Sequence, residues 1–256
     1  MKDKWALVTG ATAGLGLAVA ESLAGAGANI VLHDLVAPDE SADRLRAQFG
    51  VDVIASEADL SQRSAIEAML ADLLRRCGAI DILVNNAVVR HFSDVEHFPP
   101  DQWERALAVN VSAPFHLIRL ALPAMKQRGW GRIINMASIY STRAVEDRID
   151  YVTTKTAILG ITRAVALETA RTGITCNAVS PGTLPTPAIQ SKIASIAAKA
   201  GEPVDLATEK YLSERQPSGR FIGMDAVGAL VVFLCSAAAQ DITGATLPID
   251  GGWSIA

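Results

Sequence analysis

The chain has 256 residues, of which 50% are apolar and 20% are charged, with a formal net charge of −4 at pH 7. This length suits one large α/β domain or two small ones, and the composition is that of an ordinary soluble protein. The lack of a basic surplus excludes nucleic acid as an expected partner. The longest uncharged apolar stretch, residues 226–239, is too short to cross a bilayer, and the N-terminus has no signal-peptide pattern. We therefore expect a cytoplasmic protein that does not bind membranes.

Short apolar runs alternate with longer amphipathic stretches along the chain. The runs that favour strands are residues 6–9, 29–33, 52–56, 82–85, 132–136, 175–179 and 246–249. Helical patterns lie between them, over residues 15–25, 39–48, 61–76, 101–128, 150–171 and 225–239. This alternation predicts an α/β fold with a parallel sheet of about seven strands and helices on both faces. One domain over residues 1–256 is expected, with a helical lid at about 183–220, where Pro, Ser, Ala and Lys interrupt the pattern.

A glycine-rich turn follows the first expected strand and opens the first expected helix. Glycines in this position let the backbone turn tightly and approach a pyrophosphate, while the helix N-terminus supplies free N–H groups. The spacing differs from the common G-x-G-x-x-G fingerprint, but the position between strand and helix is the required one. The turn therefore predicts a dinucleotide site that includes Gly10, Thr12, Gly14, Leu15 and Gly16.

Asp34 ends the second expected strand. An acidic side chain there accepts hydrogen bonds from the adenosine ribose and repels a 2′-phosphate. No Arg or Lys stands at positions 33, 35 or 36 to neutralise it, which favours NAD over NADP. The alternative is a solvated aspartate in a turn. Asp59 and Leu60, after the third strand, are candidates for adenine contacts, and Asn86 and Ala87 follow the fourth strand.

Tyr151 and Lys155 are four residues apart and share one face of an expected helix. A lysine cation beside a phenol favours its ionised form, which makes a proton donor and acceptor. Ser138, thirteen residues upstream of Tyr151, is placed to hold the reacting oxygen. The pattern predicts proton transfer to or from an alcohol or carbonyl oxygen, against the alternative of an exposed helix pair.

Together these motifs resemble the short-chain dehydrogenase/reductase family over essentially the whole chain. The resemblance rests on the residues and motifs Thr9-Gly10-x-x-x-Gly14-x-Gly16, Asn85-Asn86-Ala87, Asn110, Ser138, Tyr151-x-x-x-Lys155 and Pro181-Gly182. It implies a Rossmann-type doubly wound fold, hydride transfer to or from a nicotinamide, and a homotetramer.

The resemblance also implies a catalytic tetrad of Asn110, Ser138, Tyr151 and Lys155. Tyr151 would exchange the substrate proton, Ser138 would bind the same oxygen, and Lys155 would also bind the nicotinamide ribose. Asn110 would hold a water in a proton relay. By the same resemblance, the nicotinamide end would be bordered by Pro181, Gly182, Leu184 and Thr186.

Within this family the chain is most similar to the 3-hydroxybutyrate dehydrogenase branch, but the substrate-binding positions differ. The resemblance pairs the branch's Gln, His, Lys, Trp and Gln with Arg90, Tyr140, Arg148, Thr183 and Lys192. Losing the tryptophan should open space, and guanidinium groups suit planar carboxylate or phosphate groups. We expect a secondary alcohol or ketone bearing an anionic or strongly polar group. The alternatives are solvated rim cations, 3-hydroxybutyrate dehydrogenase proper, a 3-oxoacyl thioester reductase, and a non-catalytic NAD-binding sensor.

Two further positions depart from the family pattern. Val88 replaces a glycine, and because a β-branched residue avoids positive φ, we expect extended backbone there. Thr153 and Thr154 replace small residues between Tyr151 and Lys155, and we expect them to change packing only. The three cysteines are scattered and form no C-x-x-C motif, so they predict free thiols and no metal site.

Overall fold

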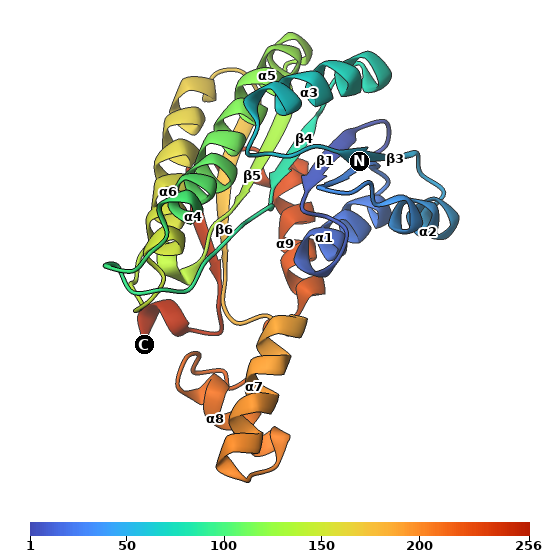
Figure 1. The fold of residues 1–256 in the computed structure, drawn as a ribbon. Coiled ribbons are helices and arrows are strands. Elements are labelled where there is room, and N and C mark those ends of the chain that lie inside the picture. Colours follow the sequence, from blue (N-terminus) through green and yellow to red (C-terminus); the bar gives the residue numbers. More distant parts are fainter.

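The computed structural model describes residues 1–256, and its strands form one sheet. The seven parallel strands lie in the order β3-β2-β1-β4-β5-β6-β7 (Figure 1). They are β1 (Trp5–Thr9), β2 (Asn29–Asp34), β3 (Val53–Glu57), β4 (Ile82–Asn85), β5 (Gly131–Met136), β6 (Ile174–Pro181) and β7 (Thr246–Ile249). The strand order reverses between β1 and β4, and ligands of such sheets bind outside the carboxyl ends of the strands at that point. The predicted doubly wound fold is confirmed.

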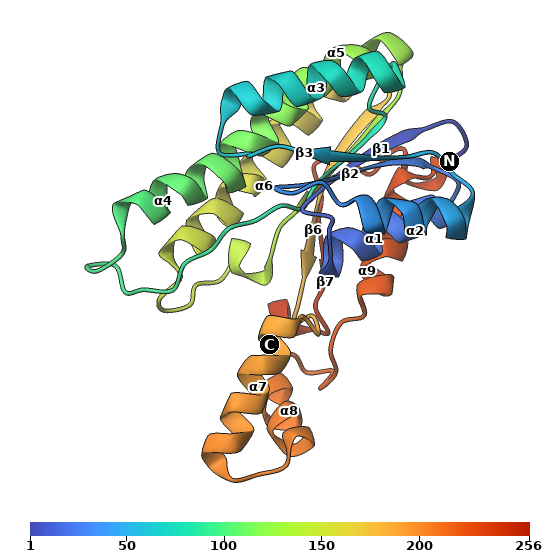
Figure 2. The ribbon, with the colours of Figure 1, turned by 45° about the vertical axis from the view of Figure 1, so that its right-hand side comes forward.

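Nine α-helices cover the sheet or project from it. They are α1 (Gly14–Gly25), α2 (Asp39–Phe49), α3 (Arg63–Cys77), α4 (Pro100–Leu107), α5 (Ala113–Arg128), α6 (Ile149–Thr169), α7 (Pro187–Ala200), α8 (Val204–Ser213) and α9 (Met224–Cys235). Helices α1, α2 and α9 lie on one face of the sheet, and α3, α4, α5 and α6 on the other (Figures 1 and 2). All six regions expected to be helical are helical, but the fourth is divided between α4 and α5, and the last ends at Cys235 and is followed by a 3₁₀ turn.

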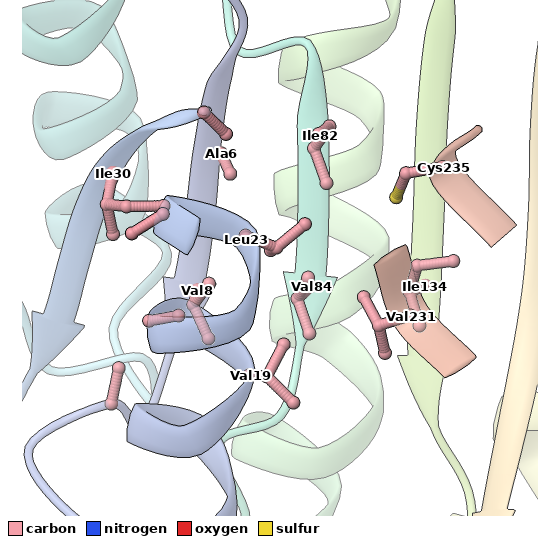
Figure 3. Packing of buried hydrophobic residues seen from close by; sticks show 14 of the residues in the cluster. Ala6, Val8, Val19, Leu23, Ile30, Ile82, Val84, Ile134, Val231 and Cys235 are labelled. Atoms are coloured by element: carbon pink, nitrogen blue, oxygen red, sulfur yellow. The ribbon is translucent and has the colours of Figure 1, made fainter. Parts of the chain in front are cut away.

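Each strand contributes to two cores because its side chains alternate between faces. In β1, Val8 belongs to the core beneath α1 and α9, whereas Leu7 belongs to the core beneath α3 and α5. Figure 3 shows Val19 and Leu23 of α1 packed beside the strands on the first side. Burial on both faces explains the near-continuous apolar runs and holds the strand ends in fixed positions.

The helix expected over 101–128 is interrupted. A single π-helical segment, Ala108–Ser112, joins α4 to α5 and carries Asn110. Such π-bulges are often found at functional sites. By length and composition the joined helix, with an apolar window of mean hydropathy 1.3, could cross a membrane. Leu117, Ile118 and Met125 are nevertheless buried against the sheet, as in the core helix of a globular protein.

The segment expected as a lid forms α7 and α8, which project away from the sheet as a hairpin (Figures 1 and 2). The hairpin has a small core of its own, made by Ile193, Ala197, Ala207, Tyr211 and Leu212. It is therefore held together internally and is attached to the sheet mainly through its two ends.

Candidate active site

A cavity of about 840 Å³ lies at the carboxyl ends of the strands and extends to α7 and α8. It brings together most of the side chains that the sequence singled out. Those that line it are Gly10, Leu15, Gly16, Asp34, Asp59, Leu60, Asn86, Ala87, Arg90, Ser138, Tyr140, Arg148, Tyr151, Lys155, Pro181, Gly182, Thr183, Leu184, Thr186 and Lys192. Thr12, Gly14 and Asn110 do not line it.

The glycine turn is shaped for a close ligand. Gly10 and Gly14 have φ values of +64° and +59°, which other residues rarely adopt. A Cβ on Gly16 would lie 2.2 Å from the Gly10 carbonyl oxygen, so this glycine is required for packing. A Cβ on Gly14 would meet nothing within 4 Å, and the N-cap Ala13 offers no side-chain cap to the first turn of α1. The turn therefore leaves both space and free N–H groups, which fits a dinucleotide pyrophosphate.

Asp34 is fixed at the end of β2 by its neighbours. Its carboxylate accepts hydrogen bonds from the Thr12 backbone N–H (3.1 Å), the Thr12 hydroxyl (2.7 Å) and the Leu35 N–H (2.9 Å). Burial raises the pKa of Asp34, but these hydrogen bonds outweigh burial and hold the pKa below its ordinary value. Asp34 is thus an anion at neutral pH, and Thr12 orients it instead of lining the cavity.

Tyr151 and Lys155 lie on one face of α6 as predicted, with the Lys155 Nζ 5.7 Å from the centre of the Tyr151 ring. The lysine is buried, and its ammonium group donates a hydrogen bond to the Met136 carbonyl at the end of β5. Burial, and secondarily the charge of Arg90, lower the pKa of Lys155 from 10.5 to about 8. A cation is therefore held beside the phenol, close to its own titration point.

Ser138 follows β5 and caps a short 3₁₀ turn, Ile139–Ser141. Its hydroxyl accepts a hydrogen bond from the Tyr140 N–H (3.3 Å), and its own N–H donates one to the Ser141 hydroxyl (3.1 Å). This reciprocal capping box fixes the orientation of Ser138. A hydroxyl, a phenol and a lysine thus share one cavity wall, a set that can bind a substrate oxygen and move its proton.

Asn110 is held by hydrogen bonds on both ends of its amide. Its Oδ1 accepts from the Val89 N–H (2.9 Å), and its Nδ2 donates to the Val89 carbonyl (2.8 Å) and to the Thr154 hydroxyl (3.2 Å). The Thr154 hydroxyl in turn donates to the Tyr151 carbonyl at 3.3 Å. The expectation that Thr154 changes packing only is therefore wrong, because it joins Asn110 to the helix that carries Tyr151. The water relay expected at Asn110 stays a prediction.

Arg148 lies at the N-terminus of α6, stacked between two aromatic rings. Its guanidinium carbon is 4.3 Å from the centre of the Phe92 ring and 4.6 Å from that of Tyr151. The Nε of Arg148 is buried without a hydrogen-bond partner. Burial, then the charge of Arg90, lower the pKa of this guanidinium. An anionic ligand at the cavity face of Arg148 would relieve the repulsion between the two arginines.

Tyr140 forms the next part of the wall. Its ring is edge-on to Tyr151 (6.3 Å between centroids) and to Trp253 (5.7 Å). Burial raises the pKa of Tyr140, while Arg215 and Arg148 act in the opposite direction. Val88 also lines the cavity, and its φ is not positive, as expected from its branched side chain.

Several cavity residues were missed by sequence reasoning, among them three with large aromatic or cationic side chains. Tyr211 and Arg215 come from α8 and the turn after it, and Trp253 comes from the C-terminal segment. The Arg215 guanidinium stacks 3.7 Å from the centre of the Tyr211 ring. Arg215 and Trp253 lie in segments that resemble the family branch, but nothing in the sequence assigned them or Tyr211 to the cavity.

Comparison with known proteins agrees with this geometry. The family described as Enoyl-(Acyl carrier protein) reductase matches residues 10–254. The chain is 44% identical over 254 residues to the D-beta-hydroxybutyrate dehydrogenase of Cupriavidus necator, covering 99% of this chain and 98% of that protein. It is 41% identical to the protein of the same name from Rhizobium meliloti, covering 98% of each chain. The crystal structure of L-sorbose reductase from Gluconobacter frateurii, complexed with NADPH and L-sorbose, matches with a TM-score of 0.94 at 29% identity, covering 100% of this chain and 98% of that chain.

Proposed function

This chain belongs to the short-chain dehydrogenase/reductase family, whose named members here are dehydrogenases and reductases acting on CH–OH groups, and from that premise we propose a narrower activity. The protein is an NAD-dependent dehydrogenase of secondary alcohols, or reductase of the matching ketones, whose substrates carry an anionic group. The observation that carries the anionic part is the partly buried Arg148 guanidinium, which lines the cavity, stacks on the Tyr151 ring and has a buried Nε without a hydrogen-bond partner.

Some of the site residues transfer the proton, and others stabilise charge or hold the cofactor. Tyr151 takes the hydroxyl proton during oxidation and returns it during reduction. The Ser138 hydroxyl donates a hydrogen bond to the same oxygen as its negative charge develops. Lys155 stabilises the ionised phenol through its charge. When bound, the nicotinamide supplies the hydride chemistry, while the turn Gly10–Gly16 and Asp34 would hold its dinucleotide.

The preference for NAD is supported by the charge at Asp34. Its carboxylate lies at the cavity wall as an anion, and no Arg or Lys occupies positions 33, 35 or 36. The L-sorbose reductase structure with NADPH shows that this fold also accommodates the phosphorylated cofactor. The test is therefore to compare kcat/KM with NAD and with NADP. We expect kcat/KM to favour NAD at least tenfold, and Asp34→Ser to shrink that ratio. Equal use of NADP by the unaltered enzyme would contradict the assignment.

The substrate class is tested by a panel of secondary alcohols and ketones that differ in charge. It comprises 3-hydroxybutyrate, longer hydroxy acids, neutral diols, ketoses and a 3-oxoacyl thioester, each assayed with NAD or NADH. We expect the acids to be preferred, and Arg148→Gln to raise KM for the acids more than for the neutral compounds. If neutral alcohols turn over as well as the acids, the anionic class is refuted and a polyol or ketose activity replaces it.

A second candidate, D-beta-hydroxybutyrate dehydrogenase proper, is favoured by the 44% identity over nearly the full length of both chains. The same panel separates the two, since that activity requires 3-hydroxybutyrate itself to be the best substrate. As family members commonly do, we expect the protein to form a homotetramer in the cytoplasm. Light scattering at assay concentration tests the tetramer.

A further inference from the structure

The α7–α8 hairpin presents two cations to the cavity around Tyr211. The ring of Tyr211 is part of the hairpin's own core, which fixes its position. Arg215 stacks on this ring and donates a hydrogen bond from Nη1 to the Tyr211 carbonyl (2.8 Å), while Lys192 lies 5.9 Å from the ring centre. Both side chains line the cavity. The stacked guanidinium is thus preorganised, and its other N–H groups remain for a ligand.

These two cations are separate from the pair beside Tyr151. Arg148 stacks on the rings of Phe92 and Tyr151, whereas Arg215 and Lys192 lie over the ring of Tyr211. Arg90 and Arg148 come from the segment after β4 and from the start of α6, whereas Arg215 and Lys192 come from the hairpin and the turn after it. The cavity wall thus has one cationic position beside the Tyr151 ring and a second one on the hairpin.

No protein carboxylate forms an ion pair with Arg90, Arg148 or Lys192. Glu146 and Asp147 line the same region but are exposed and form no ion pair with any of the four cations. The buried Asp150 carboxylate favours the charged form of Arg148 without pairing with it, and it accepts hydrogen bonds from the backbone N–H groups of His91 and Tyr151. Only Arg215 has an acidic partner, the solvent-exposed Glu214 at 3.3 Å, and exposed pairs of this kind contribute little. The uncompensated charge is complementary to more than one anionic group.

We propose that the substrate carries two anionic groups, one bound by Arg90 and Arg148 beside Tyr151 and the other by Arg215 and Lys192 on the hairpin. The chemical class is a hydroxy or oxo acid with a second, terminal carboxylate or phosphoryl group. This rests on the proposed function and extends it to a second binding position, which makes the hairpin part of substrate recognition.

The test compares probes that share one carbinol and one carboxylate. A series of 3-hydroxy acids ends in a methyl group, a second carboxylate or a phosphonate, with one to four methylenes before the end group. We expect the best dianionic probe to exceed its methyl-ended counterpart in kcat/KM by about tenfold or more, the range for charged hydrogen bonds. The carboxylate and phosphonate arms identify which anion fits better.

Variants assign the effect to the hairpin. Arg215→Gln and Lys192→Gln should each reduce the ratio of dianion to monoanion kcat/KM several-fold, and Arg215→Lys should preserve much of it. Because each ratio is taken within one variant, a general disturbance of the hairpin cancels. Lys199→Gln removes an exposed charge from the same helix α7 away from the cavity, and should leave the ratio unchanged.

The possible outcomes distinguish a failure of the second anion position from a failure of the proposed hydroxy-acid activity. Monoanions that equal or exceed dianions, or a Lys199 variant that loses as much as the Arg215 variant, would overturn the second anion position and leave the hydroxy-acid activity standing. Neutral alcohols that equal the acids would instead refute the anionic substrate altogether. Unchanged NAD affinity in the Arg215 and Lys192 variants should accompany the expected result, and weakened NAD affinity would assign these cations to the cofactor instead.

Discussion

Replacing Thr154 with valine removes one hydroxyl from the buried link between Asn110 and α6. Valine has nearly the same shape, so the change isolates the hydrogen bonds. The Asn110 Nδ2 loses the acceptor at 3.2 Å, and the Tyr151 carbonyl loses the donor at 3.3 Å, in a place where Thr154 is fully buried. Leaving a buried polar group unpaired costs about 1–3 kcal/mol. For a chain of this size, a loss of about 2 kcal/mol corresponds to a fall of roughly 4–8 °C in Tm.

Calorimetry and steady-state kinetics on Thr154→Val and Thr154→Ser measure this effect. We expect the valine variant to lose stability and to lower kcat on the order of tenfold, since the turn of α6 that carries Tyr151 loses an anchor. Serine keeps the hydroxyl and should restore both. If the valine variant matches the unaltered enzyme in Tm and kcat, the hydroxyl of Thr154 has no role. Thr154 would then contribute through packing only, as expected from the sequence.

Four further outcomes are expected. Tyr151→Phe should lower kcat by a factor of about 10²–10⁴, the usual share of acid–base catalysis, while NADH fluorescence still reports binding, and substantial retained activity would overturn its role. Gly14→Ala should weaken NAD binding, measured by calorimetry, and should lower the free energy of unfolding by only about 1–2 kcal/mol because of its positive φ. Gly16→Ala, in contrast, should fail to fold stably, because its Cβ would meet the Gly10 carbonyl oxygen. Lys155 has a pKa of about 8 in the folded protein, against an ordinary value of 10.5. Between these two pH values the unfolded chain binds a proton at Lys155 that the folded protein does not. The contribution of Lys155 to the free energy of unfolding therefore rises with pH across this window. Lys155→Met should remove this rise, which amounts to about 3 kcal/mol, and parallel pH profiles of the two proteins would disprove the shift. Binding of an anionic substrate at pH 8 should take up protons, seen as binding enthalpies that vary with the ionisation enthalpy of the buffer, and a neutral substrate should show no such dependence.

The sheet and the cofactor turn were predictable because their signals are local. A buried strand such as β4 begins with consecutive apolar residues, Ile82–Val84, and a glycine at a positive φ lies in the short turn whose conformation requires it. The pairing of Tyr151 with Lys155 also depends on nothing beyond one helical turn. These features need no knowledge of the rest of the fold.

The contacts that the sequence did not reveal join distant segments. Thr154 meets Asn110 across 44 positions, and only the π-helical segment aims that amide at both Val89 and α6. Arg215 reaches the cavity because α8 folds back on α7 around Tyr211. Neither arrangement leaves a periodic pattern in the sequence, so the residues that choose the substrate were harder to find than those that perform proton transfer.

The cations at the substrate end also act on the proton-transfer residues. Arg90 contributes to the lowered pKa of Lys155 and of Arg148, so positive charge at the mouth of the site disfavours the charged lysine. An anion bound by Arg90 and Arg148 would offset that field and favour protonated Lys155, which in turn favours the ionised phenol of Tyr151. A neutral alcohol would leave the field in place. Arg90 and Arg148 would then favour anionic substrates in two ways, by binding the anion and by promoting the protonated form of Lys155. The proton uptake expected at pH 8 directly measures this coupling between anion binding and protonation of Lys155.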